Sequence, residues 1–247
     1  MIKTFYGVIL SHNIKTNMSD KLVVVSGGSR GIGKAIVQKY IAEGYAVATC
    51  GKSMANLETL KSEISSEKLH VFKADVSIKE EVRAFSAFVT GLGMPMVALV
   101  HNAGVFVQSP MMDEPEDTLL SQLNTNLLSA YYLTKFLNQK IEKGCHIFSI
   151  CSIASLAGYA ESGSYATSKF AMLGFTKSLR QELIPRGAKV TAVLPGATET
   201  DSWAGSGLAS ERFIKSEDVA DMVFATFKLS PSALVEELLI RPSMGDI

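Results

Sequence analysis

Tyr165 and Lys169 stand four residues apart in the stretch SYATSKFAML, whose apolar residues recur at helical spacing. Side chains four apart share one helical face, so we expect the Lys169 ammonium near the Tyr165 ring. A free phenol has a pKa of about 10, and a neighbouring cation favours its charged form. The pair therefore predicts a proton donor and acceptor that works near neutral pH. The alternative is a packed aromatic ring beside the stem of an ordinary lysine.

A glycine-rich loop follows the first apolar run of the chain. The run KLVVV leads directly into SGGSRGIG, which contains Gly27, Gly31 and Gly33, and then into a helical pattern. Glycine lets the backbone approach a pyrophosphate closely, and the helix N-terminus offers unpaired N–H groups to the anion. The loop predicts nucleotide binding, although a glycine-rich turn without a ligand would share the pattern.

The end of the second apolar run bears on which nucleotide binds. An NAD site typically carries an acidic residue there, which binds the ribose 2′-hydroxyl, whereas an NADP site carries cations. The run ends in ATCGKS, so Gly51 stands where the acid is expected and Lys52 follows it. Arg30 in the glycine loop adds a second cation, and charge-assisted hydrogen bonds from the two predict NADP(H). Otherwise Arg30 and Lys52 are ordinary solvated charges.

Short apolar runs alternate with longer helical patterns along the chain. Most early runs are apolar on both faces, as in parallel strands that helices cover on two sides. The alternation predicts an α/β fold: a Rossmann-type, doubly wound parallel sheet of about seven strands with helices on both faces. Its ligand should lie beyond the carboxyl ends of the strands. The predicted strands are residues 21–26, 45–50, 69–74, 96–101, 145–151, 188–194 and 234–240.

Composition excludes several classes of protein. Lys+Arg and Asp+Glu both total 24, so no long-range field attracts nucleic acid or an anionic membrane. The three cysteines form no CxxC pair, which argues against a disulfide framework or a thiolate-held metal and fits a reducing cytoplasm. We expect one catalytic domain over residues 21–247, because no linker or repeat divides it. Residues 1–20 read as a loosely ordered extension, since their apolar run is too short to span a bilayer and no cleavage pattern follows it.

Several motifs occur in a characteristic order: SGGSRGIG, HNAG at 101–104, Asn126 in NTNLLSA, Ser152, YATSK at 165–169 and PGATET at 195–200. Their order and spacing resemble the short-chain dehydrogenase/reductase family in its compact, single-domain form, over about residues 21–242. Single motifs such as YxxxK arise by chance, but the ordered set is specific. Two positions depart from the family: Ser26 stands where threonine is usual, and His101 where asparagine is common, as a local hydrogen-bonding substitute.

The resemblance implies a catalytic role for Ser152, Tyr165, Lys169 and Asn126. In carbonyl reduction NADPH would deliver hydride, Tyr165 would protonate the substrate oxygen, and Ser152 would donate a hydrogen bond to it. Asn126 would hold a water that links Lys169 to solvent. Taken alone, Ser152 could cap a turn and Asn126, in a predicted helix, could bond locally.

The resemblance also implies the cofactor contacts. The glycines lie at the pyrophosphate, Arg30 and Lys52 at the 2′-phosphate, Asp75 at the adenine and Thr200 at the nicotinamide. The full predicted set is Gly27, Ser29, Arg30, Gly31, Ile32, Gly33, Lys52, Asp75, Val76, Asn102, Ala103, Gly104, Tyr165, Lys169, Pro195, Gly196, Thr198 and Thr200.

The polar stretch ATETDSWAGSGLASERF reads as a mobile lid over the site. Trp203, Phe106 and Tyr159 either line an apolar wall of the substrate site or merely pack. Cys151, next to Ser152, is expected to be a buried structural thiol, because neighbouring strand residues point to opposite faces.

Three functions fit these patterns. The first is an NADPH-dependent reductase of a small-molecule carbonyl compound, a ketone or aldehyde, and the second an NADP-dependent dehydrogenase of a hydroxy acid or secondary alcohol. The third is a non-catalytic protein that senses NADP(H). The C-terminal EELLIRPSMGDI lacks the glycine-rich ending of many members that reduce acyl-carrier thioesters. The resemblance further implies a homotetramer or homodimer, paired through residues 117–138 and 164–184.

Overall fold

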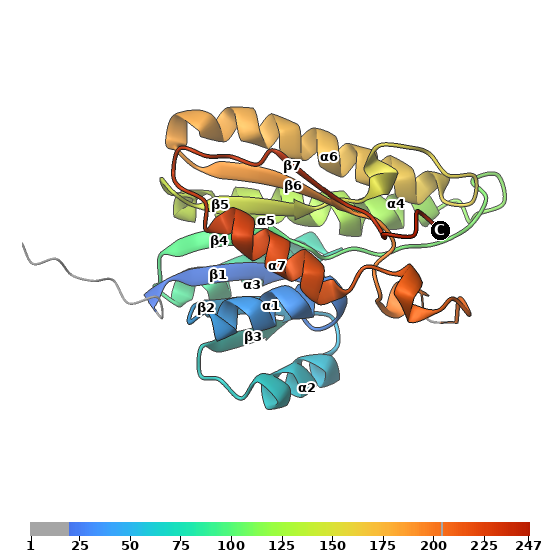
Figure 1. The fold of residues 1–247 in the computed structure, drawn as a ribbon. Coiled ribbons are helices and arrows are strands. Elements are labelled where there is room, and N and C mark those ends of the chain that lie inside the picture. The colour runs from blue at the N-terminus through green and yellow to red at the C-terminus, as the bar shows by residue number, and fades with distance from the viewer. Residues whose placement is uncertain (1–19, 204) are drawn as a thin grey trace, which may run out of the picture.

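A sheet of parallel strands runs through the computed structural model, which describes residues 20–203 and 205–247 (Figure 1). Over these residues it has seven strands in the order β3-β2-β1-β4-β5-β6-β7. The predicted extension, residues 1–20, lies outside the described residues except for Asp20. The strands are β1 (Leu22–Ser26), β2 (Ala46–Gly51), β3 (Leu69–Lys73), β4 (Met96–His101), β5 (His146–Ile150), β6 (Lys189–Pro195) and β7 (Glu237–Ile240). The strand order reverses between β1 and β4, where a ligand of such a sheet binds.

Helices cover both faces of the sheet. One face packs against α1 (Gly31–Ala42), α2 (Met54–Ile64) and α7 (Ser216–Phe227), and the other against α3 (Lys79–Gly91), α5 (Ser129–Phe136) and α6 (Gly163–Leu183). The alternation along β1 explains this division, because Val23 and Val25 face the first group while Leu22 and Val24 face the second. The predicted Rossmann-type, doubly wound fold is therefore confirmed.

The helical segment predicted around 117–138 is not one regular helix. It consists of α4 (Thr118–Leu123), a π-helical turn (Asn124–Leu128) and α5. A π-helical turn widens the backbone spiral and is frequent at functional sites. Asn126 lies in this turn and is buried, which corrects its expected place in a regular helix.

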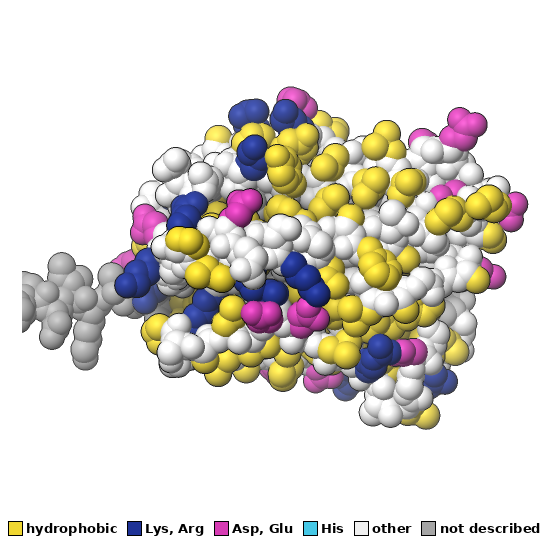
Figure 2. Space-filling model, turned by 90° about the horizontal axis from the view of Figure 1, so that it is seen from above, with side chains coloured by type: hydrophobic (Ala, Val, Ile, Leu, Met, Phe, Trp, Pro, Cys, Tyr) yellow, Lys and Arg dark blue, Asp and Glu magenta, His cyan; other side chains and the backbone are white. Residues whose placement is uncertain are grey.

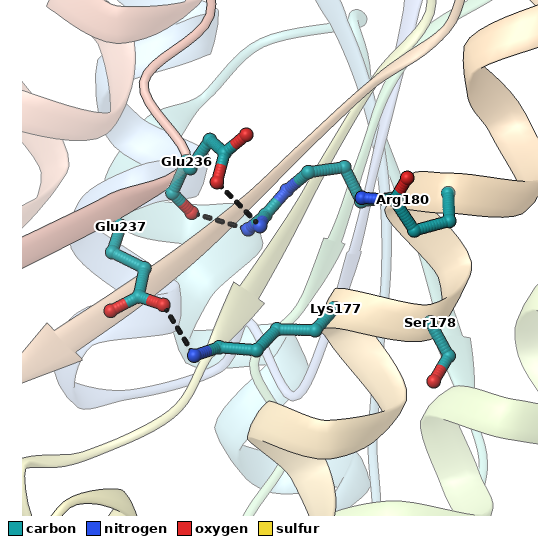
Figure 3. Close-up of a pocket in the computed structure, with 6 residues that line it drawn as sticks. Lys177, Ser178, Arg180, Glu236 and Glu237 are labelled. Atoms are coloured by element: carbon teal, nitrogen blue, oxygen red, sulfur yellow. Dashed lines mark hydrogen bonds and ion pairs between the residues drawn. The ribbon is translucent and has the colours of Figure 1, made fainter.

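Arg180 of α6 fastens the edge strand β7 to the rest of the sheet (Figure 3). Its buried guanidinium donates to the carbonyl oxygens of Val190, at 2.9 Å, and Glu236, at 2.6 Å, and also pairs with the Glu236 carboxylate. Lys177 pairs with Glu237 beside it, at 2.8 Å. Because β7 is held in place, its last residue Ile240 can accept the Gly196 N–H at 2.8 Å and position the turn after β6.

Candidate active site

The loops that follow β1, β4, β5 and β6 gather at the carboxyl edge of the sheet, on the right of Figure 1. The glycine loop, the HNAG motif, Ser152 and the PGATET motif all lie on these loops. The N-terminal turn of α6, which carries Tyr165, lies at the same edge. Segments that are distant in sequence are thus brought to one place.

Lys169 is a buried cation beside the tyrosine. Lys169 is only 5% exposed. Its Nζ donates to the carbonyl oxygen of Ile150, the last residue of β5, at 3.0 Å. Nζ also lies 5.7 Å from the centre of the Tyr165 ring. Because Lys169 is buried, it is not an ordinary lysine whose ammonium group reaches solvent.

Ser152 begins the short helical turn after β5. Its Oγ accepts the Ala154 N–H at 3.1 Å, while Ser155 Oγ accepts the Ser152 N–H at 3.3 Å. This is the turn cap considered above as an alternative. The cap uses the hydroxyl of Ser152 as an acceptor, so the O–H hydrogen is left to donate to a substrate oxygen.

Asn126 joins two segments of the site. Its Oδ1 accepts the Val105 N–H at 2.7 Å, and its Nδ2 donates to the Val105 carbonyl at 3.0 Å and to Ser168 Oγ at 2.8 Å. Both amide hydrogens are therefore used. A Cβ at Gly104 would lie 3.4 Å from Asn126 Oδ1 and 3.6 Å from Lys169 Nζ, so the asparagine and the lysine flank the same glycine.

The glycine loop has conformations and close approaches that other residues would not permit. Gly27 and Gly31 have φ angles of +69° and +53°, in the left-handed region. A Cβ at Gly33 would come within 2.3 Å of both Gly27 O and Asn102 Nδ2. Asn102 holds the loop from the β4 side, since its Nδ2 donates to the carbonyl oxygens of Ser26, at 3.1 Å, and Gly27, at 2.8 Å.

Two buried hydroxyl groups complete the cradle. Ser26 Oγ accepts the N–H groups of Asn102, at 3.1 Å, and Ala103, at 3.2 Å, so the serine retains a hydroxyl where threonine is usual. Thr49, which the sequence reasoning missed, accepts the Gly28 N–H at 3.1 Å and donates to Val25 O at 2.7 Å. A threonine in the otherwise apolar second run was the available signal.

Both predicted 2′-phosphate cations are paired with carboxylates. Arg30 contacts Asp201 at 2.8 Å, and Lys52 contacts Asp75 at 2.8 Å. Burial raises the pKa of Asp75, but the hydrogen bonds from Lys52 and Ser77, together with the Lys52 charge, outweigh it and the pKa is lowered. Arg30 and Asp201 are 67% and 70% exposed at their side chains, so their pair is worth no more than about 1 kcal/mol and a phosphate can displace it.

The remaining predicted cofactor residues lie around the loop. Thr200 touches the glycine loop, because a Cβ at Gly31 would lie 3.0 Å from its methyl group. Thr198 Oγ1 donates to the Gly196 carbonyl within the turn at 3.0 Å. Ser29 lies beside Gly51, while Ile32 and Val76 are half-buried and pack against the two opposite cores. These last two provide packing for the site and no side-chain polar group.

An aromatic cluster covers Tyr165. Phe106 meets the Tyr165 ring edge-on with centroids 4.7 Å apart, and Trp203 lies 6.4 Å from Phe106. Phe213 extends the cluster at 5.5 Å from Trp203. Two of the three aromatic residues singled out in the sequence are thus brought together beside Tyr165, while Tyr159 is 39% exposed.

A sequence profile described as short chain dehydrogenase matches residues 21–209. The chain belongs to this family. Among the relatives of this short chain dehydrogenase, an uncharacterised oxidoreductase of Staphylococcus haemolyticus is 27% identical over 229 residues, which cover 92% of this chain and 99% of the relative.

Solved structures of similar proteins support the assignment. A short chain dehydrogenase from Burkholderia cenocepacia, in complex with NADP, has a TM-score of 0.84 and 28% identity, covering 92% of this chain and 98% of that one. An alcohol dehydrogenase from the archaeon Thermococcus sibiricus, complexed with 5-hydroxy-NADP, has a TM-score of 0.83 and 26% identity, over 90% and 97% of the two chains. The resemblance deduced from the motifs is confirmed.

Other chemistry-bearing groups near the site are structural in this short chain dehydrogenase. His101 Nε2 hydrogen-bonds Thr134 Oγ1 at 2.9 Å, and burial lowers the pKa of His101 to about 3. Burial also raises the pKa of the Cys151 thiol to about 11, in keeping with the expected structural thiol. Within residues 20–203 and 205–247, no group of three or more His, Cys, Asp or Glu side chains could hold a metal ion, and no helix is long and apolar enough to cross a membrane.

We predict that His101→Asn weakens the pH dependence of stability. Below its ordinary pKa of 6.5 the histidine takes up a proton only in the unfolded chain, so the free energy of unfolding falls from pH 6.5 down to about pH 3. At pH 5 this loss is about 2 kcal/mol. Urea unfolding at pH 7 and at pH 5 should show that, between these two pH values, the variant loses about 2 kcal/mol less of its free energy of unfolding than the parent does. Equal losses in both proteins would contradict the assignment.

Proposed function

We propose that this short chain dehydrogenase uses NADPH to reduce a ketone or aldehyde to an alcohol, with Tyr165 as the proton donor. The observation that carries the proposal is the buried Lys169 ammonium beside the Tyr165 ring, at the edge of the sheet where the glycine loop begins. Burying a cation is costly, so a cation kept at this point favours a functional role beside the Tyr165 phenol.

The cradle fits a dinucleotide. Gly27, Gly31 and Gly33 let the loop turn and pack tightly against neighbouring protein atoms at the N-terminus of α1, and α1 presents its unpaired N–H groups there. Arg30 and Lys52 would exchange their carboxylate partners for a 2′-phosphate, as suits NADP(H). Two similar solved structures hold NADP or a derivative of it, which supports this choice.

The chain's own residues handle the proton. Bound NADPH supplies hydride to the carbonyl carbon. Tyr165 Oη donates its proton to the carbonyl oxygen, and the Ser152 O–H orients that oxygen by a second hydrogen bond. The Lys169 cation lies beside the phenolate that remains, and its Nζ can relay a proton from solvent back to that phenolate through a water beside Asn126. Since both amide hydrogens of Asn126 are used, such a water can bind the second lone pair of Oδ1.

The same residues serve the reverse reaction, the oxidation of an alcohol by NADP+. The direction depends on the cofactor ratio and the substrate, so the two enzymatic functions share one site. We favour an enzyme over a sensor, since a protein that only binds the nucleotide has no need of a proton donor beside a buried cation.

We also propose that residues 21–247 act as one catalytic domain in the cytoplasm and assemble as a homodimer or homotetramer. All three cysteines are free and buried, which suits a reducing compartment. Leu120 of α4 is 60% exposed, Tyr131 of α5 39% and Phe170 of α6 47%, so apolar surface is left on the two segments expected to pair. Figure 2 views the face that carries α6, over which hydrophobic side chains are spread.

Replacing Tyr165 by Phe tests the proposed chemistry. The ring remains and the proton donor is lost, so kcat should fall by about two to four orders of magnitude while the Kd of NADPH stays unchanged. Turnover is followed by NADPH absorbance over a panel of ketones, and binding by NADPH fluorescence. Activity in the variant close to that of the parent would contradict the role of Tyr165.

Two variants test the cofactor assignment in opposite directions. Lys52→Ala should weaken the binding of NADPH by about tenfold and the binding of NADH much less, because a charged hydrogen bond to the 2′-phosphate is lost. Asp201→Asn should raise the affinity for NADPH by about threefold, because the carboxylate that competes with the phosphate for Arg30 is removed. Calorimetric titrations with both cofactors measure these changes, and equal effects on NADPH and NADH would contradict the assignment.

Leu120→Glu combined with Phe170→Glu tests self-association. A charge in an apolar interface is costly, so the oligomer should dissociate to smaller species. Light scattering coupled to size exclusion gives the mass, and Met222→Glu, on the exposed side of α7, is the matched control. An unchanged oligomer in the double variant would contradict this interface.

A further inference from the structure

Three segments form one surface beside Tyr165: residues 105–117 after β4, 153–164 after β5, and 197–203 with 205–213 after β6. The first two are paired through residues 108–114 and 161–164. Ser109 forms a β-bridge with Ser162, Gln108 Nε2 donates to Glu161 at 3.0 Å, and Ser164 hydrogen-bonds Glu114. The third joins them through the contact of Trp203 with Phe106.

Large apolar side chains of this surface meet solvent. Besides the aromatic contact over Tyr165, it carries large hydrophobic side chains that are each about 40% exposed or more. These are Val105, Val107, Met111, Met112, Leu156, Tyr159 and Leu208, of which Met112 reaches 89%. Water-exposed apolar area of this kind next to a reactive group marks a site for an apolar ligand.

The charges on the three segments are almost all negative. Arg212 is their one basic residue, and its Nη2 donates to the Asp246 carbonyl at 3.4 Å. Outside the segments, Arg30 pairs with Asp201 and is assigned above to the 2′-phosphate of the cofactor, and Lys169 donates to the Ile150 carbonyl. The acidic residues number eight: Asp113, Glu114, Glu116, Asp117, Glu161, Glu199, Asp201 and Glu211. A substrate carboxylate or phosphate would therefore be repelled by this surface.

We propose that the substrate is an uncharged ketone or aldehyde with a large apolar body, and that carbonyl compounds bearing a carboxylate or phosphate are rejected. The carbonyl group binds at Tyr165 and Ser152, and the apolar body lies on Phe106, Trp203 and the exposed hydrophobic side chains around them. This inference rests on the proposed function and narrows it, because it disfavours a hydroxy acid as the alcohol of the reverse reaction.

Two substrate series test the proposal by NADPH absorbance at saturating NADPH. In linear methyl ketones from butanone to decanone, kcat/KM should rise by about three- to fourfold per methylene until the surface is covered. A long-chain methyl ketone with a terminal carboxylate should react at least about tenfold more slowly than its methyl ester, and the gap should shrink in high salt. The remote ester or acid leaves the reactivity of the ketone unchanged, so binding alone separates the pair.

Matched variants assign the effect to the surface. Trp203→Ala should reduce the preference for decanone over butanone, while Leu229→Ala, an exposed leucine just beyond α7, should not. Glu161→Gln should raise the rate of the acid relative to the ester about two- to threefold. Glu142→Gln, in the turn that precedes β5 at the opposite edge of the sheet, should leave this ratio unchanged.

A binding readout separates failure of this inference from failure of the proposed function. Trp203 is the one tryptophan in the sequence, so its fluorescence can report ketone binding in the unreactive complex with NADP+. Decanone should change the emission and the long-chain acid should not. Turnover of the acid as fast as the ester, or of butanone as fast as decanone, would overturn the substrate class alone. A complete absence of ketone reduction despite NADPH binding would overturn the proposed function and this inference with it.

Discussion

The buried ammonium of Lys169 constrains the whole site. A charge moved out of water is costly unless hydrogen bonds and nearby negative charge compensate it. Here the compensation comes from the carbonyl of Ile150, the last residue of β5, and from the face of the Tyr165 ring. The ring contact is set within α6, whereas the contact with Ile150 depends on the position of α6 along the sheet, because a shift of the helix by one residue would leave the cation buried without its acceptor. The register of α6 against β5 therefore also fixes Tyr165 relative to Ser152, two residues beyond the end of that strand.

The rest of the site differs in rigidity from one side to the other. Around the dinucleotide cradle and the catalytic helix, buried amides and hydroxyls bridge neighbouring segments: Asn102 and Ser26 join the loops after β1 and β4, and Asn126 joins the loop after β4 to α6. Such buried hydrogen bonds are expensive to break, since each leaves a polar group unpaired. Asp201 and Trp203 in the segment after β6 contact the loops after β1 and β4 through the exposed Arg30–Asp201 pair and an aromatic contact, which are easier to exchange. A firm cradle and an adjustable entrance suit an enzyme that must exchange both cofactor and substrate.

The fold and much of the site could be predicted because their signals are local. Strands buried on both faces appear as apolar runs, and the glycine loop and the tyrosine–lysine pair are each set by spacing of a few residues. The features that sequence reasoning missed depend on distant partners. The π-helical turn accommodates Asn126, whose partner Ser168 lies 42 residues further on, and the Arg30–Asp201 pair joins positions 171 residues apart. Thr49 lies in an otherwise apolar strand, and its role depends on Gly28, which only the fold brings beside it.

The most direct test of the account is a crystal structure of the enzyme with NADP+ and an unreactive long-chain ketone. We expect the ketone oxygen within hydrogen-bond distance, about 2.6–3.2 Å, of both Tyr165 Oη and Ser152 Oγ, with the nicotinamide ring beside the carbonyl carbon and Lys169 still donating to Ile150. A nicotinamide bound away from Tyr165, or a Lys169 side chain directed out of the site in that complex, would contradict it.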